Sequence, residues 1–177
     1  MHKPEFILVI GGARSGKSRY AEEIAERAGK PVTYAATAGA PRDAEMEARI
    51  TLHQSRRPDH WRTLEVPLDL AAAVPGEGIL LIDCLTLWLT NLMLGEHDIA
   101  AGRARLLEAL EVRERPVIAV ANEVGEGIVP ATPLGRAFRD EQGMLNQAMA
   151  RAATTVIKMV AGIPLMVKPA PEPRIQL

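Results

Sequence analysis

The residues from Gly11 to Ser18 have the types and spacing of a phosphate-binding loop, G-x-x-x-x-G-K-S. An apolar run, Phe6–Ile10, precedes them and a helical pattern, Tyr20–Arg27, follows, so the strand–loop–helix context of this motif is present. The glycines let successive backbone N–H groups point into one concavity, which favours an anion together with the helix N-terminus. Lys17 is expected to reach the β- and γ-phosphates of a nucleoside triphosphate, and the Ser18 hydroxyl is expected to bind Mg²⁺.

Asp83 is the natural second half of such a site. It ends the apolar run Gly78–Ile82, and an apolar strand that ends in a carboxylate is typical of nucleotide sites in which the Asp helps to hold Mg²⁺. An alternative is that Asp83 caps a helix predicted over Leu85–Leu94. The two roles are compatible.

His53 lies in an unusual setting for a structural histidine. In a helix predicted over 43–57, His53 shares one stripe with Arg49 and Arg57, and Arg56 is adjacent. Nearby positive charge disfavours protonation of the imidazole, and a neutral imidazole can act as a nucleophile while arginines stabilise the phosphate that it attacks. The competing interpretation is an ordinary surface or packing histidine.

The remaining pattern predicts the elements that must position these residues. Apolar runs over 32–36, 78–83, 117–121 and 155–160 indicate further strands, and helical patterns alternate with them over 68–74, 85–94, 98–114 and 134–153. An irregular or edge-strand segment is expected over 59–67, and an apolar run over 163–168. This alternation predicts an α/β, P-loop NTPase-like fold of the RecA-like type, with helices on both faces of a mostly parallel sheet. Loops that begin at Gly11, Thr37, Asp83 and Asn122 are expected to converge at the carboxyl ends of the strands.

Chain length, net charge and cysteine count limit the possible domain organisation, partners and location of the protein. A chain of 177 residues with a net charge of −1 suits one domain, expected over 1–168, and gives no support for a nucleic-acid or membrane partner. The Pro-rich segment 169–177 is expected to be a mobile tail. Cys84 is the single cysteine, which excludes an intrachain disulfide, and with no apolar stretch of membrane-spanning length we expect a cytoplasmic protein.

Other nucleotide-dependent classes lack support. Asn122–Gly125 reads N-E-V-G rather than the N-K-x-D signature of switch GTPases, and the protein-kinase motifs do not occur. A kinase or nucleotidyltransferase of small molecules is therefore favoured.

Several motifs together resemble one family, the bifunctional adenosylcobinamide kinase/adenosylcobinamide-phosphate guanylyltransferases of cobalamin biosynthesis. They occur in the family's order from about residue 6 to 168. The motifs are Gly11–Ser18, Arg49-Ile50 with His53, Arg57-Pro58, Trp61–Thr63 with Glu65, Leu81–Met93, Asn122–Pro130, Phe138–Asp140 and Asn146-Gln147.

This resemblance implies two reactions and a quaternary state. The kinase would phosphorylate adenosylcobinamide with ATP or GTP, and the transferase would pass GMP from GTP, through a histidine–GMP intermediate, to adenosylcobinamide phosphate. The product would be adenosylcobinamide-GDP. Mg²⁺ is the implied cofactor, and a homo-oligomer, a trimer, is implied as well.

The resemblance also implies residue roles. His53 and Lys17 would be catalytic, Ser18 and Asp83 would hold the metal, and Asn122, Glu123 and Arg139 are candidates for contact with the corrinoid. The implied nucleotide contacts are Gly11, Gly12, Ala13, Arg14, Ser15, Gly16, Lys17, Ser18, Ala36, Thr37, Ala38, Gln54, Ser55, Arg56, Arg57, Glu65 and Asp83.

The chain departs from the family pattern at Ala38, where relatives often carry Ser, and at Leu52, where some carry a second histidine. Two alternatives stay open. One is a P-loop small-molecule kinase without guanylyl transfer, in which His53 only binds phosphate. The other is a non-catalytic nucleotide-sensing module.

Overall fold

A computed structural model describes residues 3–39, 44, 51, 55 and 57–170. Most of the helix predicted over 43–57 lies outside these residues, including His53, Gln54 and Arg56. Ala44, Thr51 and Ser55, which are described, are helical. Residues 171–177 of the predicted tail also lie outside.

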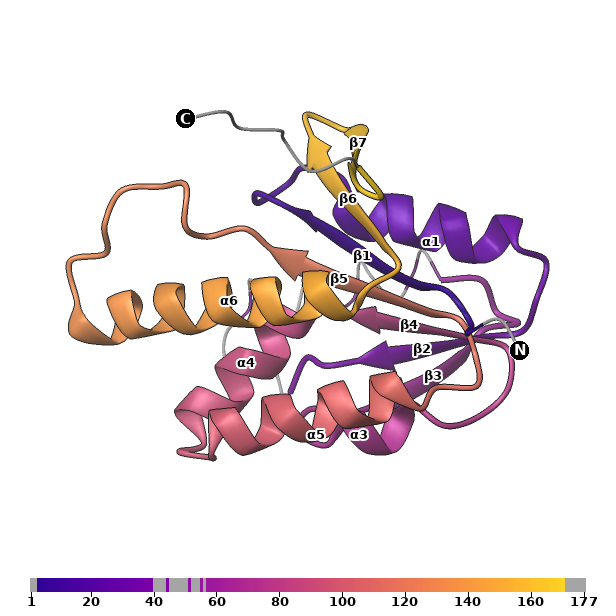
Figure 1. The fold of residues 1–177 in the computed structure, drawn as a ribbon, viewed down its shortest axis with the longest axis horizontal. Coiled ribbons are helices and arrows are strands. Elements are labelled where there is room, and N and C mark those ends of the chain that lie inside the picture. Colours follow the sequence, from indigo (N-terminus) through magenta and orange to yellow (C-terminus); the bar gives the residue numbers. More distant parts are fainter. Residues whose placement is uncertain (1–2, 40–43, 45–50, 52–54, 56, 171–177) are drawn as a thin grey trace, which may run out of the picture.

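A mixed sheet forms the centre of the fold (Figure 1). Within the described residues it has seven strands in the order β3-β2-β4-β5-β1-β6-β7. All neighbouring pairs are parallel except β6 and β7. The strands are β1 (Phe6–Gly11), β2 (Val32–Ala36), β3 (Arg62–Glu65), β4 (Ile79–Asp83), β5 (Val117–Asn122), β6 (Thr155–Val160) and β7 (Ile163–Lys168).

Helices cover both faces of this sheet, as Figure 1 shows: α1 lies on one face, and α3, α4, α5 and α6 lie on the other. The helices are α1 (Lys17–Arg27), α3 (Leu70–Ala73), α4 (Leu85–Leu94), α5 (Ile99–Glu111) and α6 (Pro133–Ala152). The predicted α/β fold, with helices on both faces of a mostly parallel sheet, is therefore confirmed.

The central strands are apolar on both sides because each side contributes to a separate core. In β4, Leu80 and Ile82 pack with the α3–α6 layer, whereas Ile79 and Leu81 pack with α1. Successive side chains of a strand point to opposite faces, so a continuous apolar run fills both cores. This explains why 78–83 lacks the polar alternation of a strand with one solvated face.

The carboxyl ends of the strands meet at one edge, as the loop positions predict. Gly11 is in register with Asn122, and Ala36 is in register with both Asp83 and Glu65. Backbone hydrogen bonds continue past the strands, from Glu123 N to Gly11 O (2.9 Å) and from Thr37 N to Asp83 O (3.4 Å). The four predicted loops therefore start side by side.

The apolar run 163–168 is an element that the sequence left unassigned. It forms β7, an antiparallel edge strand that returns from β6 through a turn at Ala161 and Gly162, both with positive φ. Its apolar side chains are largely exposed, including Ile163 and Met166, so its pattern lacks the two-residue period of a half-buried strand.

The helix predicted over 98–114 ends earlier, at Glu111, because two buried arginines follow it. Arg113 donates to Leu110 O and Pro4 O. Arg115 donates to Val74 O, Glu77 O and Ala73 O. These contacts satisfy carbonyl groups at the amino edge of the sheet, opposite the predicted site. No helix among the described residues is both long and apolar enough to cross a lipid bilayer.

The two-sided core predicts a large loss of stability on truncation of a central strand. Leu81→Ala should lower the free energy of unfolding by about 2–5 kcal/mol, because the Leu81 side chain is fully buried and leaves a cavity. Urea unfolding measures this change. Leu165→Ala, half-exposed on β7, is the matched control and should cost less than about 0.5 kcal/mol; equal losses for both variants would contradict the assigned core.

Candidate active site

The phosphate loop connects β1 to α1 and depends on glycine at two positions. Gly11 has φ +156°, and a Cβ there would lie 2.6 Å from Met159 O and 2.8 Å from Ser15 Oγ. Gly16 has φ +92° and is the N-cap of α1, where it has no side chain to cap the first N–H groups. Those N–H groups and the positive end of the helix dipole therefore face the loop, as an anion requires.

Lys17 lies within this loop rather than in solvent. Its ammonium donates to Gly12 O (2.5 Å) and Ser15 Oγ (3.4 Å), and the residue is 7% exposed. Burial lowers the pKa of Lys17, while the neighbouring Cys84 and Asp83 act in the opposite direction. The cation is thus held at the start of α1, where it can approach a phosphate bound by the loop.

Asp83 receives hydrogen bonds on both carboxylate oxygens. Ser18 Oγ donates to Oδ1 (3.1 Å), and the Tyr34 hydroxyl donates to Oδ2 (2.7 Å). A carboxylate beside a hydroxyl offers the hard oxygen ligands that Mg²⁺ prefers, so these two residues fit the ion. The N-cap of α4 is Cys84 rather than Asp83.

Tyr34 and Cys84 are both held in their protonated forms. Burial, followed by the charge of Asp83, raises the pKa of the Tyr34 hydroxyl far above its ordinary value. The same two causes, in the same order, raise the pKa of the Cys84 thiol to about 12. A thiol with this pKa is a poor nucleophile near neutral pH.

Thr37 fixes the loop that follows β2. Its hydroxyl donates to Cys84 O (2.7 Å) and accepts from Cys84 N (2.8 Å), and its carbonyl accepts from Asn91 Nδ2 (2.7 Å). Thr37 is fully buried, so its side chain joins β2 to the start of α4. The neighbouring Ala38 is half-buried.

The segment after the predicted histidine helix packs against β2. The Arg57 guanidinium lies over the Tyr34 ring, with Cζ 3.7 Å from the centroid. Trp61 also approaches this ring, with the centroids 6.4 Å apart, and its Nε1 donates to Glu26 Oε2 (2.9 Å).

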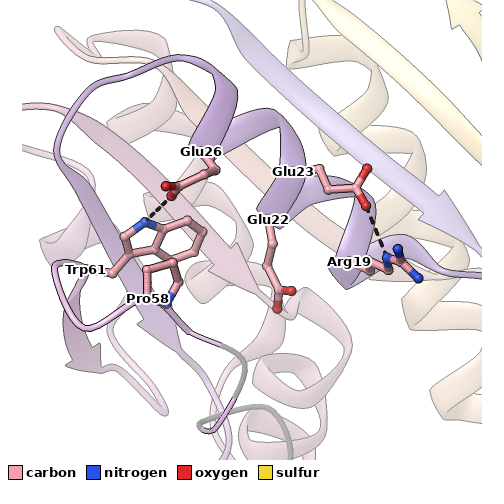
Figure 2. Close-up of a pocket in the computed structure, with 6 residues that line it drawn as sticks. All are labelled: Arg19, Glu22, Glu23, Glu26, Pro58 and Trp61. Atoms are coloured by element: carbon pink, nitrogen blue, oxygen red, sulfur yellow. Dashed lines mark hydrogen bonds and ion pairs between the residues drawn. The ribbon is translucent and has the colours of Figure 1, made fainter.

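A pocket of about 400 Å³ lies beside α1 next to this segment (Figure 2). Trp61 and Pro58 lie together near Glu26 on one side, while Glu23 points toward Arg19 on the other. Its lining is acidic, from Glu22, Glu23 and Glu26, and repels phosphate. The phosphate loop and this pocket are therefore chemically distinct.

A buried polar network holds the end of β5. Thr86 Oγ1 accepts from Asn122 N (2.8 Å), and Asn146 Nδ2 donates to Asn122 O (3.0 Å). Gln142, fully buried in α6, donates to Asn146 Oδ1 (2.8 Å). Its own Oε1 has no hydrogen-bond partner within the described part of the chain. The backbone of Asn122 is thus fixed beside Gly11.

The structure brings together many of the expected site residues. The phosphate loop and its hydrogen bonds bring together Gly11, Ser15, Gly16, Lys17, Ser18 and Asp83. The exposed rim of the loop is formed by Gly12, Ala13 and Arg14. Ala36 lies between Asp83 and Glu65 in the sheet register, and the Glu65 side chain is exposed. Ser55 is exposed, and Arg57 reaches Tyr34 rather than the loop. His53, Gln54 and Arg56 lie outside the described residues.

Sequence reasoning missed several polar residues that support this edge. Tyr34 and Gln142 were not singled out, and Thr86, Asn91 and Asn146 appeared only within the motifs of the family resemblance. Tyr34 carried one available signal, since it is a hydroxyl-bearing residue two positions before the carboxyl end of a buried strand. The other partners are set by the packing of α4 and α6.

The network around Asn146 yields a stability prediction. Asn146→Leu should cost about 1–3 kcal/mol of unfolding free energy, because Gln142 Nε2 and Asn122 O each lose a buried partner. The double variant Gln142→Leu/Asn146→Leu should lose less than the sum of the two single variants, since one buried donor–acceptor pair is removed together. Additive losses in chemical unfolding would contradict the network.

Comparisons with known proteins extend these observations. The family model described as "Cobinamide kinase / cobinamide phosphate guanyltransferase" matches residues 7–167. The bifunctional adenosylcobalamin biosynthesis protein CobP of Pseudomonas aeruginosa is 49% identical over 170 residues, which cover 93% of this chain and 98% of that protein. The corresponding CobU protein of Salmonella typhimurium is 43% identical, covering 92% of this chain and 99% of its own.

A solved structure from Pyrococcus horikoshii superposes with a TM-score of 0.55 at 10% identity, covering 97% of this chain and 90% of that one, which supports the fold alone. The family match spans the phosphate loop, Asp83 and nearly all of the sheet. The chain belongs to the cobinamide kinase/cobinamide phosphate guanyltransferase family.

Proposed function

We propose that this protein phosphorylates adenosylcobinamide and then transfers GMP from GTP to adenosylcobinamide phosphate, giving adenosylcobinamide-GDP. Family membership supports both activities. The observation that carries the proposal is the gathering of Lys17, Ser18 and Asp83 at the start of α1, on a loop shaped for phosphate. ATP and GTP would donate phosphate, and GTP alone would donate GMP.

For the kinase reaction, the loop N–H groups of Gly12–Ser18 would bind the triphosphate and Lys17 would contact its β- and γ-phosphates. Ser18 and Asp83 would hold Mg²⁺. When bound, this ion neutralises phosphate charge during phosphoryl transfer. The substrate hydroxyl displaces the nucleoside diphosphate at the γ-phosphorus, and the new P–O bond gives cobinamide phosphate.

For the transferase reaction, the neutral imidazole of His53 would attack the α-phosphorus of GTP. A P–N bond forms while the P–O bond to pyrophosphate breaks. An oxygen of adenosylcobinamide phosphate then displaces His53 and accepts GMP. The guanine nucleotide would be contacted by residues that follow His53 in the chain and by the end of β2 with the loop after it. These residues are Gln54, Ser55, Arg56, Arg57, Glu65 and Ala36–Ala38.

The same proposal extends to the assembly and location of the protein. Chain length supports one domain over 1–168, and the single cysteine supports a cytoplasmic enzyme. The family resemblance supports a homotrimer, and Asn122, Glu123 and Arg139 are candidates for contact with the corrinoid. The near-neutral net charge gives no reason to expect nucleic acid as a partner.

Labelling with α-phosphate-labelled GTP tests the transferase. The wild-type protein should retain label as an acid-labile, alkali-stable adduct, because a phosphoramidate is hydrolysed in acid. His53→Ala should abolish the adduct. His60→Ala, which changes an exposed imidazole beside Glu26, is the matched control and should label normally. A wild-type protein that phosphorylates cobinamide without forming the adduct would be the simpler kinase, and one without turnover would be a sensing module.

Removal of the metal gives a second test. Excess EDTA should stop both cobinamide phosphorylation and adduct formation, and added Mg²⁺ should restore them, since both displacements occur on one triphosphate. Asp83→Asn should raise the Mg²⁺ concentration needed for half-maximal rate by about tenfold or more. Full activity of the wild type in EDTA would contradict the assigned role of Ser18 and Asp83.

A further inference from the structure

Tyr34 contacts two parts of the site at once. Its side chain is 1% exposed in the middle of β2, its hydroxyl reaches Asp83, and its ring face lies against Arg57. We propose that Tyr34 is a positioning residue that orients the metal-binding carboxylate and also anchors Arg57, which stands four positions after His53 in the chain. This inference rests on the proposed function.

The Tyr34 hydroxyl fixes the orientation of the Asp83 carboxylate. Asp83 has Ser18 on Oδ1 at 3.1 Å, and Tyr34 occupies Oδ2 at 2.7 Å. A bond to the second oxygen fixes the rotation of the carboxylate while leaving the oxygen that faces Ser18 directed at the loop. Partners of this kind, which orient a metal ligand without touching the ion, typically change metal affinity by about 10–100-fold.

The Tyr34 ring holds the guanidinium of Arg57. Arg57 lies at cation–π distance over Tyr34, and its Nη1 is 3.5 Å from Thr63 Oγ1. Arg57 Nε is buried and has no hydrogen-bond partner among the residues that the structure describes. The aromatic face is therefore a principal contact of this guanidinium, which stands four positions after His53 in the chain. Loss of the ring would release Arg57 from this contact.

These two contacts predict different effects on the two reactions. The hydroxyl acts on Asp83, so its loss should change the metal requirement of both reactions. The ring contacts Arg57, four positions after His53 in the chain. Its loss should therefore slow guanylylation of the protein by more than the change in metal affinity explains. Tyr34→Phe removes the first contact alone, and Tyr34→Leu removes both.

Metal binding tests the hydroxyl without measuring turnover. Mn²⁺ is titrated into the protein saturated with a non-hydrolysable GTP analogue, and free Mn²⁺ is followed by electron paramagnetic resonance. Tyr34→Phe should weaken Mn²⁺ binding by about tenfold. Tyr20→Phe makes the same change at the other tyrosine and should leave the affinity within about twofold. A Tyr34→Phe protein that melts normally and binds Mn²⁺ like the wild type would overturn this half.

Guanylylation at saturating Mg²⁺ tests the ring. The change from Tyr34→Phe to Tyr34→Leu should slow formation of the labelled adduct by about tenfold, an effect between those of an exposed and a desolvated cation–π contact. The same change combined with Arg57→Gln should have less than about a twofold effect, since the partner of the ring is already gone. Equal losses in both backgrounds, or a matching loss of kinase rate, would overturn the link.

Tyr34→Met, whose flexible unbranched side chain can fill an irregular space, replaces Tyr34→Leu if that variant does not fold. A wild-type protein without either activity would remove the proposed function, but the Mn²⁺ titration would still decide whether Tyr34 orients Asp83.

Discussion

The carboxylate of Asp83 is the point on which the site depends. It stands at the end of β4 and accepts hydrogen bonds from Ser18 at the start of α1 and from Tyr34 in β2. A charged group in this half-buried position is tolerated only when its oxygens are paired, and each pairing element is fixed by a separate strand or helix. The phosphate loop, the strand register and the Tyr34 hydroxyl therefore act on one carboxylate.

The surrounding sheet makes this convergence possible. Because the strands are parallel, their carboxyl ends lie at one edge, and residues far apart in the chain become neighbours there. Polar side chains then fix the backbone just beyond the strands: Thr37 pairs with Cys84, and Asn146 and Thr86 hold Asn122. The opposite edge is closed differently, by Arg113 and Arg115 on carbonyl groups. One edge is thereby left for chemistry, and the other serves stability.

Strand positions and the phosphate loop were predictable from sequence because both are local signals. Apolar runs of five or six residues marked the buried strands, and G-x-x-x-x-G-K-S specified its own backbone shape. β7 escaped prediction because its apolar side chains face solvent and carry no period. The end of α5 was misplaced because a buried arginine that binds carbonyl groups looks, in sequence, like one on a helix surface.

The sequence by itself determined the phosphate-binding loop and the family to which this chain belongs, since glycine spacing and motif order are properties of the chain. Only the tertiary structure decided which side chains support Asp83. Tyr34 and Ser18 reach it from β2 and α1, 49 and 65 residues away in sequence. No local rule encodes those distances, because they arise from the order in which parallel strands pair and from the face that each side chain takes.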